Sequence, residues 1–273
     1  MAIVLNEYEW AERMIANRDL GAKPGETLSR VAKYYFENRY SKREVRKLLD
    51  QFLMQCNPDA SLVHWSDALD KIVKTASRFP LIQIDYVYVS PAELSRIEEL
   101  GNKQLKRLAF TMLCVVKYWN AVSANNNNWL NAQDKDIFQM ANITVPSKKH
   151  DLMYGALREA GFIRLSKRID NLNVQILFAD EEEPEDVTNG ILVRDFRNLG
   201  YQYMKYHGEA FFECESCGLT VRSKERAASK TAARHGFAKP IGRRQKYCPS
   251  CAMKIKTRQN VAAVMRRRNS DVK

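Results

Sequence analysis

The chain has 273 residues and a formal net charge of +12, a length that fits one to three domains with a buried core. The opening sequence MAIVLNEYEW lacks the basic and apolar regions of a signal peptide, and no apolar run reaches the length of a membrane span. These features argue against a secreted or membrane-spanning protein, so we expect a cytosolic chain whose Cys56 and Cys114 are reduced core thiols.

Amphipathic helices are expected through most of the first hundred residues. Apolar side chains recur at helical spacing over residues 26–38, 41–53 and 62–76. Ser41 followed by Glu44 is a capping-box pattern, which predicts that the second of these helices begins at that serine. This region should therefore form a helical domain.

The ends of this helical region carry further local signals. Pro24 and Gly25 are expected to break the chain just before the first helix. The sequence LIQIDYVYV, residues 81–89, alternates apolar and polar side chains in its first half and predicts a strand. Ser90 and Glu93 flank a proline in the pattern of a helix start, so another helix should follow.

One segment of the helical region resembles a known module. The sequence ETLSRVAKYYFENRYSKREVRKLLDQFLMQCNPD…LDKIVKTA, within residues 24–77, is similar to the small helical module that follows the catalytic domain in many phage and plasmid primases. The resemblance implies a replication-associated ancestry. Because the catalytic primase domain is absent, it does not imply polymerase activity.

Residues 101–180 predict a second domain built from three helices and a hairpin. An apolar helix over 103–123 precedes a shorter one, for which Asn131 is a candidate cap, and a third that ends at Gly161. The segment 162–180 alternates on both sides of an Asp-Asn-Leu-Asn turn, as a hairpin does. This order is that of a winged helix, and LMYGALREAGFIRLSK resembles its recognition helix and first wing strand.

The winged-helix resemblance implies particular contacts with nucleic acid. In that fold the third helix enters the major groove with its N-terminal residues leading, and the wing touches the backbone or the minor groove. The cations and the histidine at those two places are Lys148, Lys149 and His150 on the helix and Arg164, Lys167 and Arg168 on the wing. The alternative is a winged helix that serves protein contact or packing alone.

Residues 181–200 are expected to form an acidic linker and a lead-in to the last domain. The run DEEEPED at 180–186 is typical of a solvated linker, and it could also occupy a basic surface when nucleic acid is absent. Six aromatic residues follow: Phe196, Tyr201, Tyr203, Tyr206, Phe211 and Phe212. The first interpretation is that they pack around a small metal domain, and the second is that they stack on bases.

Two Cys-x-x-Cys pairs predict a metal site. Cys214 with Cys217 and Cys248 with Cys251 supply four thiolates, which suit one tetrahedral Zn²⁺ in a closed, structural site. The pairs are separated by 30 residues, which implies an inserted loop. Two disulfides are the alternative pairing chemistry, and replacement of one thiolate by His207 or His235 is the alternative ligand set.

The charge map makes the metal-bearing end a candidate nucleic-acid surface. Residues 214–273 hold 16 Lys or Arg and 3 Asp or Glu, whereas the other 213 residues hold 28 and 29. Cations with so few acids are typical of a surface that binds a polyanion. The predicted contacts are Arg222, Lys224, Arg226, Lys230, Arg234, Arg243, Arg244, Lys246, Lys254, Lys256, Arg258, Arg266, Arg267 and Arg268.

The end of the chain has helical composition. The sequence AMKIKTRQNVAAVMRRRN predicts a basic terminal helix, whose Ile255, Val261, Ala262 and Met265 are available for packing. The preceding stretch between the cysteine pairs is basic and poor in large apolar residues. We expect that stretch to be an arm that orders on a phosphate backbone.

Signals for catalysis are missing from the sequence. It contains no Gly-rich phosphate loop with Lys-Ser/Thr and no His-Glu-x-x-His. Nucleases of the His-Asn-His type often carry paired Cys-x-x-Cys sites, but His235 lacks the neighbouring acid and second histidine that such enzymes use. We therefore expect no enzyme, no catalytic residue and no small-molecule substrate.

The expected fold class is mainly α (α+β). It comprises a primase-C-terminal-like helical domain (1–100), a winged helix (101–180), the acidic linker and lead-in (181–200), and a small Cys₄ zinc ribbon with a basic loop and basic terminal helix (201–273). This combination resembles uncharacterised phage or prophage proteins, which implies action in the cytoplasm of a bacterial host cell.

Two functional hypotheses follow. The first is a non-enzymatic, zinc-containing DNA- or RNA-binding protein, either a transcription regulator or a replication accessory. The alternative is a phage-encoded inhibitor that docks on a host nucleoprotein, such as a defence ribonucleoprotein or RNA polymerase. Both need a cationic surface, and neither involves a membrane.

Overall fold

The computed structural model describes residues 3–123, 125–166, 173–180, 189–223 and 245–270, with side chains in the last range given up to residue 266. Ten helices and six short strands within these ranges make the protein mainly helical with small sheets, which confirms the expected mainly α class. No helix in the described ranges is both long and apolar enough to cross a lipid bilayer.

The chain divides into two compact units, residues 2–87 and residues 88–273. The division falls within β1 (Val87–Val89), well before the expected end of the helical domain at residue 100. The finer boundaries at 180 and 200 stay predictions, as do the winged helix and the zinc ribbon as named domains.

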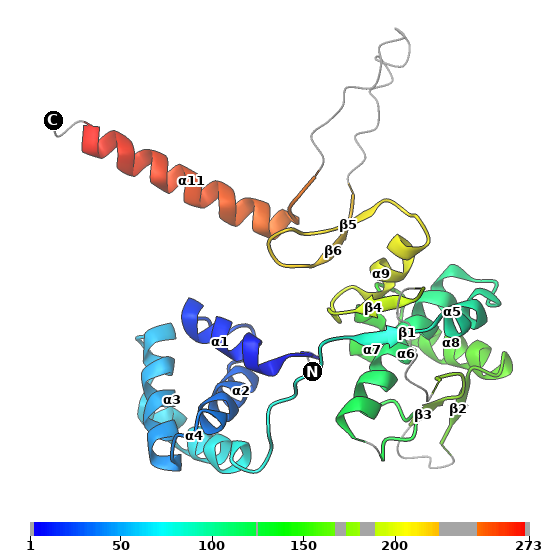
Figure 1. The fold of residues 1–273 in the computed structure, drawn as a ribbon, viewed down its shortest axis with the longest axis horizontal. Helices are drawn as coiled ribbons and strands as arrows, with labels where there is room; N and C mark the ends of the chain where they lie inside the picture. The colour runs from blue at the N-terminus through cyan, green and yellow to red at the C-terminus, as the bar shows by residue number, and fades with distance from the viewer. Residues whose placement is uncertain (1–2, 124, 167–172, 181–188, 224–244, 271–273) are drawn as a thin grey trace, which may run out of the picture. The chain divides into compact units, whose positions relative to one another are not determined.

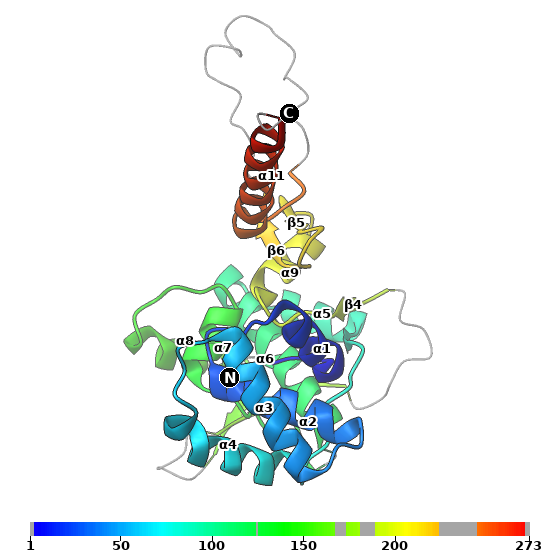
Figure 2. The same cartoon turned by 90° about the vertical axis from the view of Figure 1, so that its left-hand side faces the viewer.

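The first unit is a four-helix cluster: α1 (Glu7–Asn17), α2 (Pro24–Glu37), α3 (Lys42–Cys56) and α4 (Leu62–Ala76). Helix α2 contacts the other three (Figures 1 and 2). The apolar stripes predicted from the sequence meet in one buried core, which includes Leu28, Val31, Val45, Leu49, Phe52 and Leu69.

Local signals placed most of these helix ends correctly. The capping box at Ser41 is confirmed, because its side chain accepts from the Glu44 backbone while the Glu44 carboxylate accepts from the Ser41 N–H at 2.8 Å. Pro24 was expected to lie before α2 but occupies its first turn, where its missing N–H has no helical partner to lose. The strand predicted over 81–89 was too long: Gln83 forms only an isolated bridge, and β1 alone is regular.

A buried carboxylate holds three segments of the first unit together. Glu7, at the start of α1, accepts from Arg30 Nε at 2.8 Å and from the Ile82 backbone N–H at 3.1 Å, and lies 3.5 Å from Lys33 Nζ. A buried acid is tolerated when cations and backbone donors surround it in this way. The contact joins α1, α2 and the segment that follows α4.

The second unit is organised around α6 (Lys103–Val122), which is buried along most of its middle. Helix α5 (Pro91–Glu98) begins with the predicted capping box and packs beside α6. Glu93 of α5 is 1% exposed. Its carboxylate lies 2.7 Å from Lys117 Nζ, and it also accepts from the Asp180 backbone at 2.8 Å.

Three further elements follow the long helix in the expected order. Helix α7 (Asp134–Met140) and helix α8 (Lys148–Glu159) precede an antiparallel hairpin of β2 (Ile163–Leu165) and β3 (Val174–Ile176). The segment 128–130 adds to the other edge of β3 through two backbone bonds, 2.8 and 2.9 Å long. The helix-helix-helix-hairpin order predicted from the sequence is therefore present.

Asn131 does not cap α7. Gln133 is the residue before the helix, and the Asn131 amide donates to Asn126 Oδ1 at 2.7 Å. Asn126 is nearly buried and also donates to Asn120 Oδ1 at 2.9 Å. The asparagine-rich stretch thus forms an internal amide network.

The last elements carry the cysteines. Strand β4 (Ile191–Val193) pairs with β1, and α9 (Leu199–Tyr206) packs on α6. A second hairpin and the long helix α11 (Pro249–Ser270) complete the unit (Figure 1). The aromatic residues of this region mostly pack: Phe196 and Tyr203 are buried and lie against the rings of Tyr118 and Phe110.

Gly200 allows the close approach of α9 to the loop after α7. A Cβ at this position would overlap the carbonyl group of Ala141, whereas a Cβ at Gly155 of α8 would meet nothing within 4 Å. Gly200→Ala should lower the free energy of unfolding by about 1–3 kcal/mol through overpacking. Gly155→Ala should raise it by about 0.5–1 kcal/mol through helix propensity. Urea denaturation of both variants checks this, and equal effects would show that the close approach is not required.

Candidate metal centre

The first cysteine pair lies in the turn of a hairpin. Strands β5 (Phe211–Glu213) and β6 (Thr220–Arg222) are antiparallel, and the turn between them contains Cys214 and Cys217. Gly218 has a φ of +71°, a left-handed conformation that suits glycine, and its N–H donates to the Cys214 carbonyl at 2.8 Å. The tight turn points both sulfurs toward the same point.

The second pair lies at the beginning of α11. Cys248 directly precedes the helix and Cys251 lies in its first turn. The Cys248 N–H donates to Cys214 Sγ at 3.3 Å, and the Cys251 N–H donates to Cys248 Sγ at 3.4 Å. Backbone donors at a helix N-terminus favour thiolate over thiol, which is the form that binds metal.

The four sulfurs form one cluster. All four lie within 4.8 Å of one another, and Cys217 Sγ is 3.9 Å from Cys248 Sγ. A tetrahedral ion with sulfur ligands at about 2.3 Å places the sulfurs about 3.8 Å apart, so the spacing fits one metal ion. Within the described ranges, this is the one group of three or more potential metal-ligating side chains.

The alternative chemistries of the cysteines receive no support. All six cysteines are free thiols, so the two-disulfide interpretation is wrong for this structure. His207 lies elsewhere, with its Nε2 at 3.2 Å from Glu98 Oε1. His235 is outside the described residues. The four cysteines could supply all four ligands of a tetrahedral ion without a histidine.

The environments of two sulfurs differ. Burial acts to raise the pKa of Cys214, but backbone N–H groups of Cys248, Ser216 and Cys217 point at its sulfur and lower that pKa below the usual thiol value. Burial and the neighbouring sulfurs raise the pKa of Cys217 instead. Cys214 is therefore the first of the two to ionise, and binding of a divalent cation would release the remaining protons.

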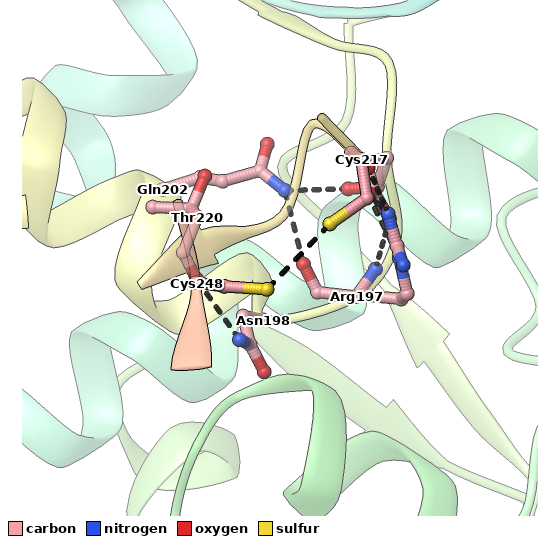
Figure 3. A network of polar contacts seen from close by, with 7 residues as sticks. Arg197, Asn198, Gln202, Cys217, Thr220 and Cys248 are labelled. Atoms are coloured by element: carbon pink, nitrogen blue, oxygen red, sulfur yellow. Dashed lines mark hydrogen bonds and ion pairs between the residues drawn. The ribbon is translucent and has the colours of Figure 1, made fainter. Parts of the chain in front are cut away.

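Arg197 hydrogen-bonds to the backbone of the turn that contains Cys214 and Cys217. Its Nη2 donates to the Cys217 carbonyl at 2.6 Å (Figure 3). The same nitrogen forms an ion pair of 2.6 Å with Asp195. This hydrogen-bonded pairing with Asp195 also raises the pKa of Arg197. The guanidinium thus links the segment before α9 to the backbone of a metal-ligating residue.

Asn198 connects the hairpin to the helices. Its Nδ2 donates to the Thr220 carbonyl at 2.9 Å (Figure 3). Its Oδ1 accepts from Asn142 at 2.9 Å. Asn142 Oδ1 in turn accepts from the Tyr201 N–H at 3.1 Å. Asn198 has a left-handed backbone, which asparagine tolerates better than most residues. The sequence offered no signal for this network, because its members are far apart along the chain.

The predicted nucleic-acid contacts fall into three groups. Exposed in the described ranges are Lys148, Lys149, Arg164, Arg222, Lys246, Lys254, Lys256, Arg258 and Arg266. His150 is half-buried, and its ring stacks on Phe138 with centroids 3.6 Å apart. Outside the residues whose side chains are described lie Lys167, Arg168, Lys224, Arg226, Lys230, Arg234, Arg243, Arg244, Arg267 and Arg268.

The terminal helix differs from the expectation in one respect. Ile255, Val261, Ala262 and Met265 were expected to be available for packing, but Val261 is 53% exposed and Met265 is 54% exposed. Met253 is also largely exposed. Within the described part of the chain, α11 therefore leaves both its cations and most of its large apolar side chains in solvent.

Comparison with known proteins found no relative of this chain. The chain matches no protein-family model, no curated protein and no solved structure.

Metal content tests the cysteine cluster directly. Metal analysis of the purified chain should find about one ion per chain, because four clustered thiolates without a cation would repel one another. Cys248→Ser should release the ion and unfold the hairpin and the start of α11. Cys56→Ser, in the first unit, is the matched control and should retain the metal. A folded, metal-free wild type would contradict the assignment.

The bond from Arg197 to Cys217 predicts a smaller effect on the same site. Arg197→Met should weaken metal binding by about 10–100-fold, the range for residues that orient metal ligands. Arg194→Met removes an exposed arginine three residues away and should leave the affinity unchanged. Competition with a chromophoric chelator measures both. Similar affinities for the two variants would show that Arg197 does not position the turn.

Proposed function

We propose that this chain is a non-enzymatic nucleic-acid-binding protein of phage type, in which one structural Zn²⁺ anchors a cationic helix. The observation that carries the proposal is the charge of α11. Between Pro249 and Arg266 the helix contains four Lys or Arg and no acidic residue, and all four cations are exposed. Solvated protein surfaces ordinarily mix both signs, whereas a surface of cations alone attracts a polyanion.

Zinc is the metal that best suits the cluster. Thiolates are soft ligands, and four of them at tetrahedral spacing favour Zn²⁺ over Mg²⁺ or Ca²⁺, which bind oxygen. With four protein ligands the ion has no free position for a water molecule. The zinc is thus assigned a structural role, which agrees with the absence of catalytic motifs in the sequence.

A winged helix in residues 101–180 would supply the second contact. The order α6, α7, α8, β2, β3, with the segment 128–130 on the outer edge of β3, supports this part of the proposal. Lys148 and Lys149 are exposed at the start of α8, where a recognition helix meets the groove. The stacking of His150 on Phe138 favours the two lysines as the groove contacts. A transcription regulator or a replication accessory fits this arrangement, and the primase-like first unit favours the latter.

A second function is favoured by a different observation. Met253, Val261 and Met265 are exposed on the same helix as the cations, and exposed apolar side chains in number mark protein contacts. The chain would then be a phage-encoded inhibitor that docks on a host nucleoprotein, such as a defence ribonucleoprotein or RNA polymerase. Purification from bacterial lysate with and without nuclease separates the two functions: a stoichiometric protein that survives nuclease supports the inhibitor.

The salt dependence of binding tests the cationic helix. Replacement of Lys254, Lys256 and Arg258 by Gln should weaken binding to duplex DNA of any sequence. The slope of log affinity against log salt should flatten by about 0.9 for each phosphate that the variant no longer neutralises. Fluorescence anisotropy over a range of salt concentrations measures both quantities.

The control for that experiment carries the same change of charge elsewhere. Lys71, Lys74 and Arg78 are exposed cations at the end of α4 and after it. Their replacement by Gln should leave the slope unchanged. If the two triple variants lose affinity and slope equally, α11 is not the binding surface.

A further inference from the structure

The turn between α2 and α3 and the first two turns of α3 concentrate positive charge in the first unit. Residues 38–48 contain five Lys or Arg and a single acid, Glu44. One of the five, Arg46, pairs with Asp50 and with Asp70. The other four are exposed and have no ion pair within the described residues: Arg39, Lys42, Arg43 and Lys47.

The two acids nearest to this turn are engaged elsewhere. Glu44 caps α3, where its carboxylate accepts from the Ser41 backbone and hydroxyl at 2.8 and 2.7 Å. Glu37 accepts from the Leu81 N–H at 2.9 Å and from Gln83 Nε2 at 3.2 Å. The four cations therefore face solvent, and neither carboxylate forms an ion pair with them.

The turn also holds its arginine in an unfavourable backbone conformation. Arg39 follows α2 with a φ of +63°, in the left-handed region where glycine or asparagine normally ends a helix. The described non-glycine residues with positive φ are four asparagines and two arginines, Arg18 and Arg39. Lys42 and Arg43 add a second cost, because cations in the first turn of α3 oppose the helix dipole. Stability alone would not select this arrangement.

An aromatic ring stands beside the cations. Tyr40 is 43% exposed, and its ring meets the edge of Tyr35 at 5.8 Å. Tyr35 contacts Tyr34 at 5.7 Å, and Tyr34 contacts Tyr8 at 4.8 Å. The three inner rings are half-buried, so Tyr40 is held in place with part of its ring open to solvent.

We infer that this surface binds single-stranded nucleic acid: Arg39, Lys42, Arg43 and Lys47 hold phosphates, and Tyr40 stacks on an unpaired base. Cations that follow a backbone, with an aromatic ring among them, are the elements that single-strand binding proteins combine. A duplex keeps its bases stacked inside and offers no face to Tyr40. This surface shares no residue with the contacts proposed for the second unit. The inference can therefore be tested independently of those contacts.

Two arginines with the same backbone strain provide the test. Arg39→Gly removes one charge and gives glycine a conformation that suits it, so the melting temperature should stay equal or rise. Arg18→Gly makes the same change at the end of α1, near the start of α2 and thus at the opposite end of that helix from Arg39. Both variants are made in the full chain carrying Lys254→Gln, Lys256→Gln and Arg258→Gln, so that binding by α11 does not mask the result.

The probe is a labelled 20-nucleotide single strand of mixed sequence, in DNA and RNA form. Arg39→Gly should weaken binding and lower the salt slope by about 0.7, the value for one phosphate contact on a single strand. Arg18→Gly should match the parent chain. Equal losses in the two variants, or no loss in either, overturn the inference. The strand that binds more tightly identifies whether DNA or RNA is the ligand.

The aromatic contact has its own pair of variants. Tyr40→Ala should weaken binding about five-fold or more, whereas Tyr40→Phe, which retains the ring, should bind as the parent does. If both variants bind as the parent does and inorganic polyphosphate competes as well as the oligonucleotide, the surface recognises phosphate alone and the inference of base stacking is wrong. Weaker binding by Arg39→Gly and Tyr40→Ala would support the inference even if the α11 variants proved to have no effect.

Discussion

The clustering of four sulfurs constrains the C-terminal part of this protein more than any other interaction. Two segments separated by 30 residues bring their cysteines within 4.8 Å of one another. Four thiolates at this spacing repel one another strongly, so a divalent cation or retained protons must offset the charge. Few other contacts in the described ranges join the hairpin to the start of α11, among them a backbone bond of 3.0 Å from Glu215 to Lys246. Whether the four sulfurs are held together by a cation therefore decides whether the start of α11 is fixed against the hairpin.

The cluster is in turn tied to the helices of the same unit. Arg197 bonds to a backbone carbonyl in the turn of the cysteine hairpin and Asn198 to one at the start of β6, and Gly200 brings α9 against the Ala141 carbonyl. Because these contacts are made to the backbone, they constrain the position of the turn without occupying the sulfurs. Metal binding at the cysteines would thereby be linked to the docking of α9 through one short segment of chain.

Local patterns in the sequence predicted more than long-range ones. The capping box at Ser41 and the spacing of the cysteine pairs depend on residues a few positions apart, and both are confirmed. Asn131 failed as a cap because α7 begins only after Gln133; the Asn131 amide donates to Asn126 in the asparagine network. The contact of Arg197 with Cys217 spans 20 residues and is made to a carbonyl in the hairpin turn. No periodicity or motif encodes such a contact, so it is visible only in the folded chain.

The length of α11 has a consequence for the nucleic acid that it would meet. Twenty-two residues at about 1.5 Å each make a rod about 33 Å long, close to the roughly 34 Å pitch of a DNA duplex. Lys254, Lys256 and Arg258 follow one another at two-residue steps, so successive cations point to different sides of the rod. Such a rod attracts phosphates on more than one side, so its charges alone do not fix its orientation. Only its attachment at the cysteines can fix its direction, so the metal centre would determine the line along which the helix meets a polyanion.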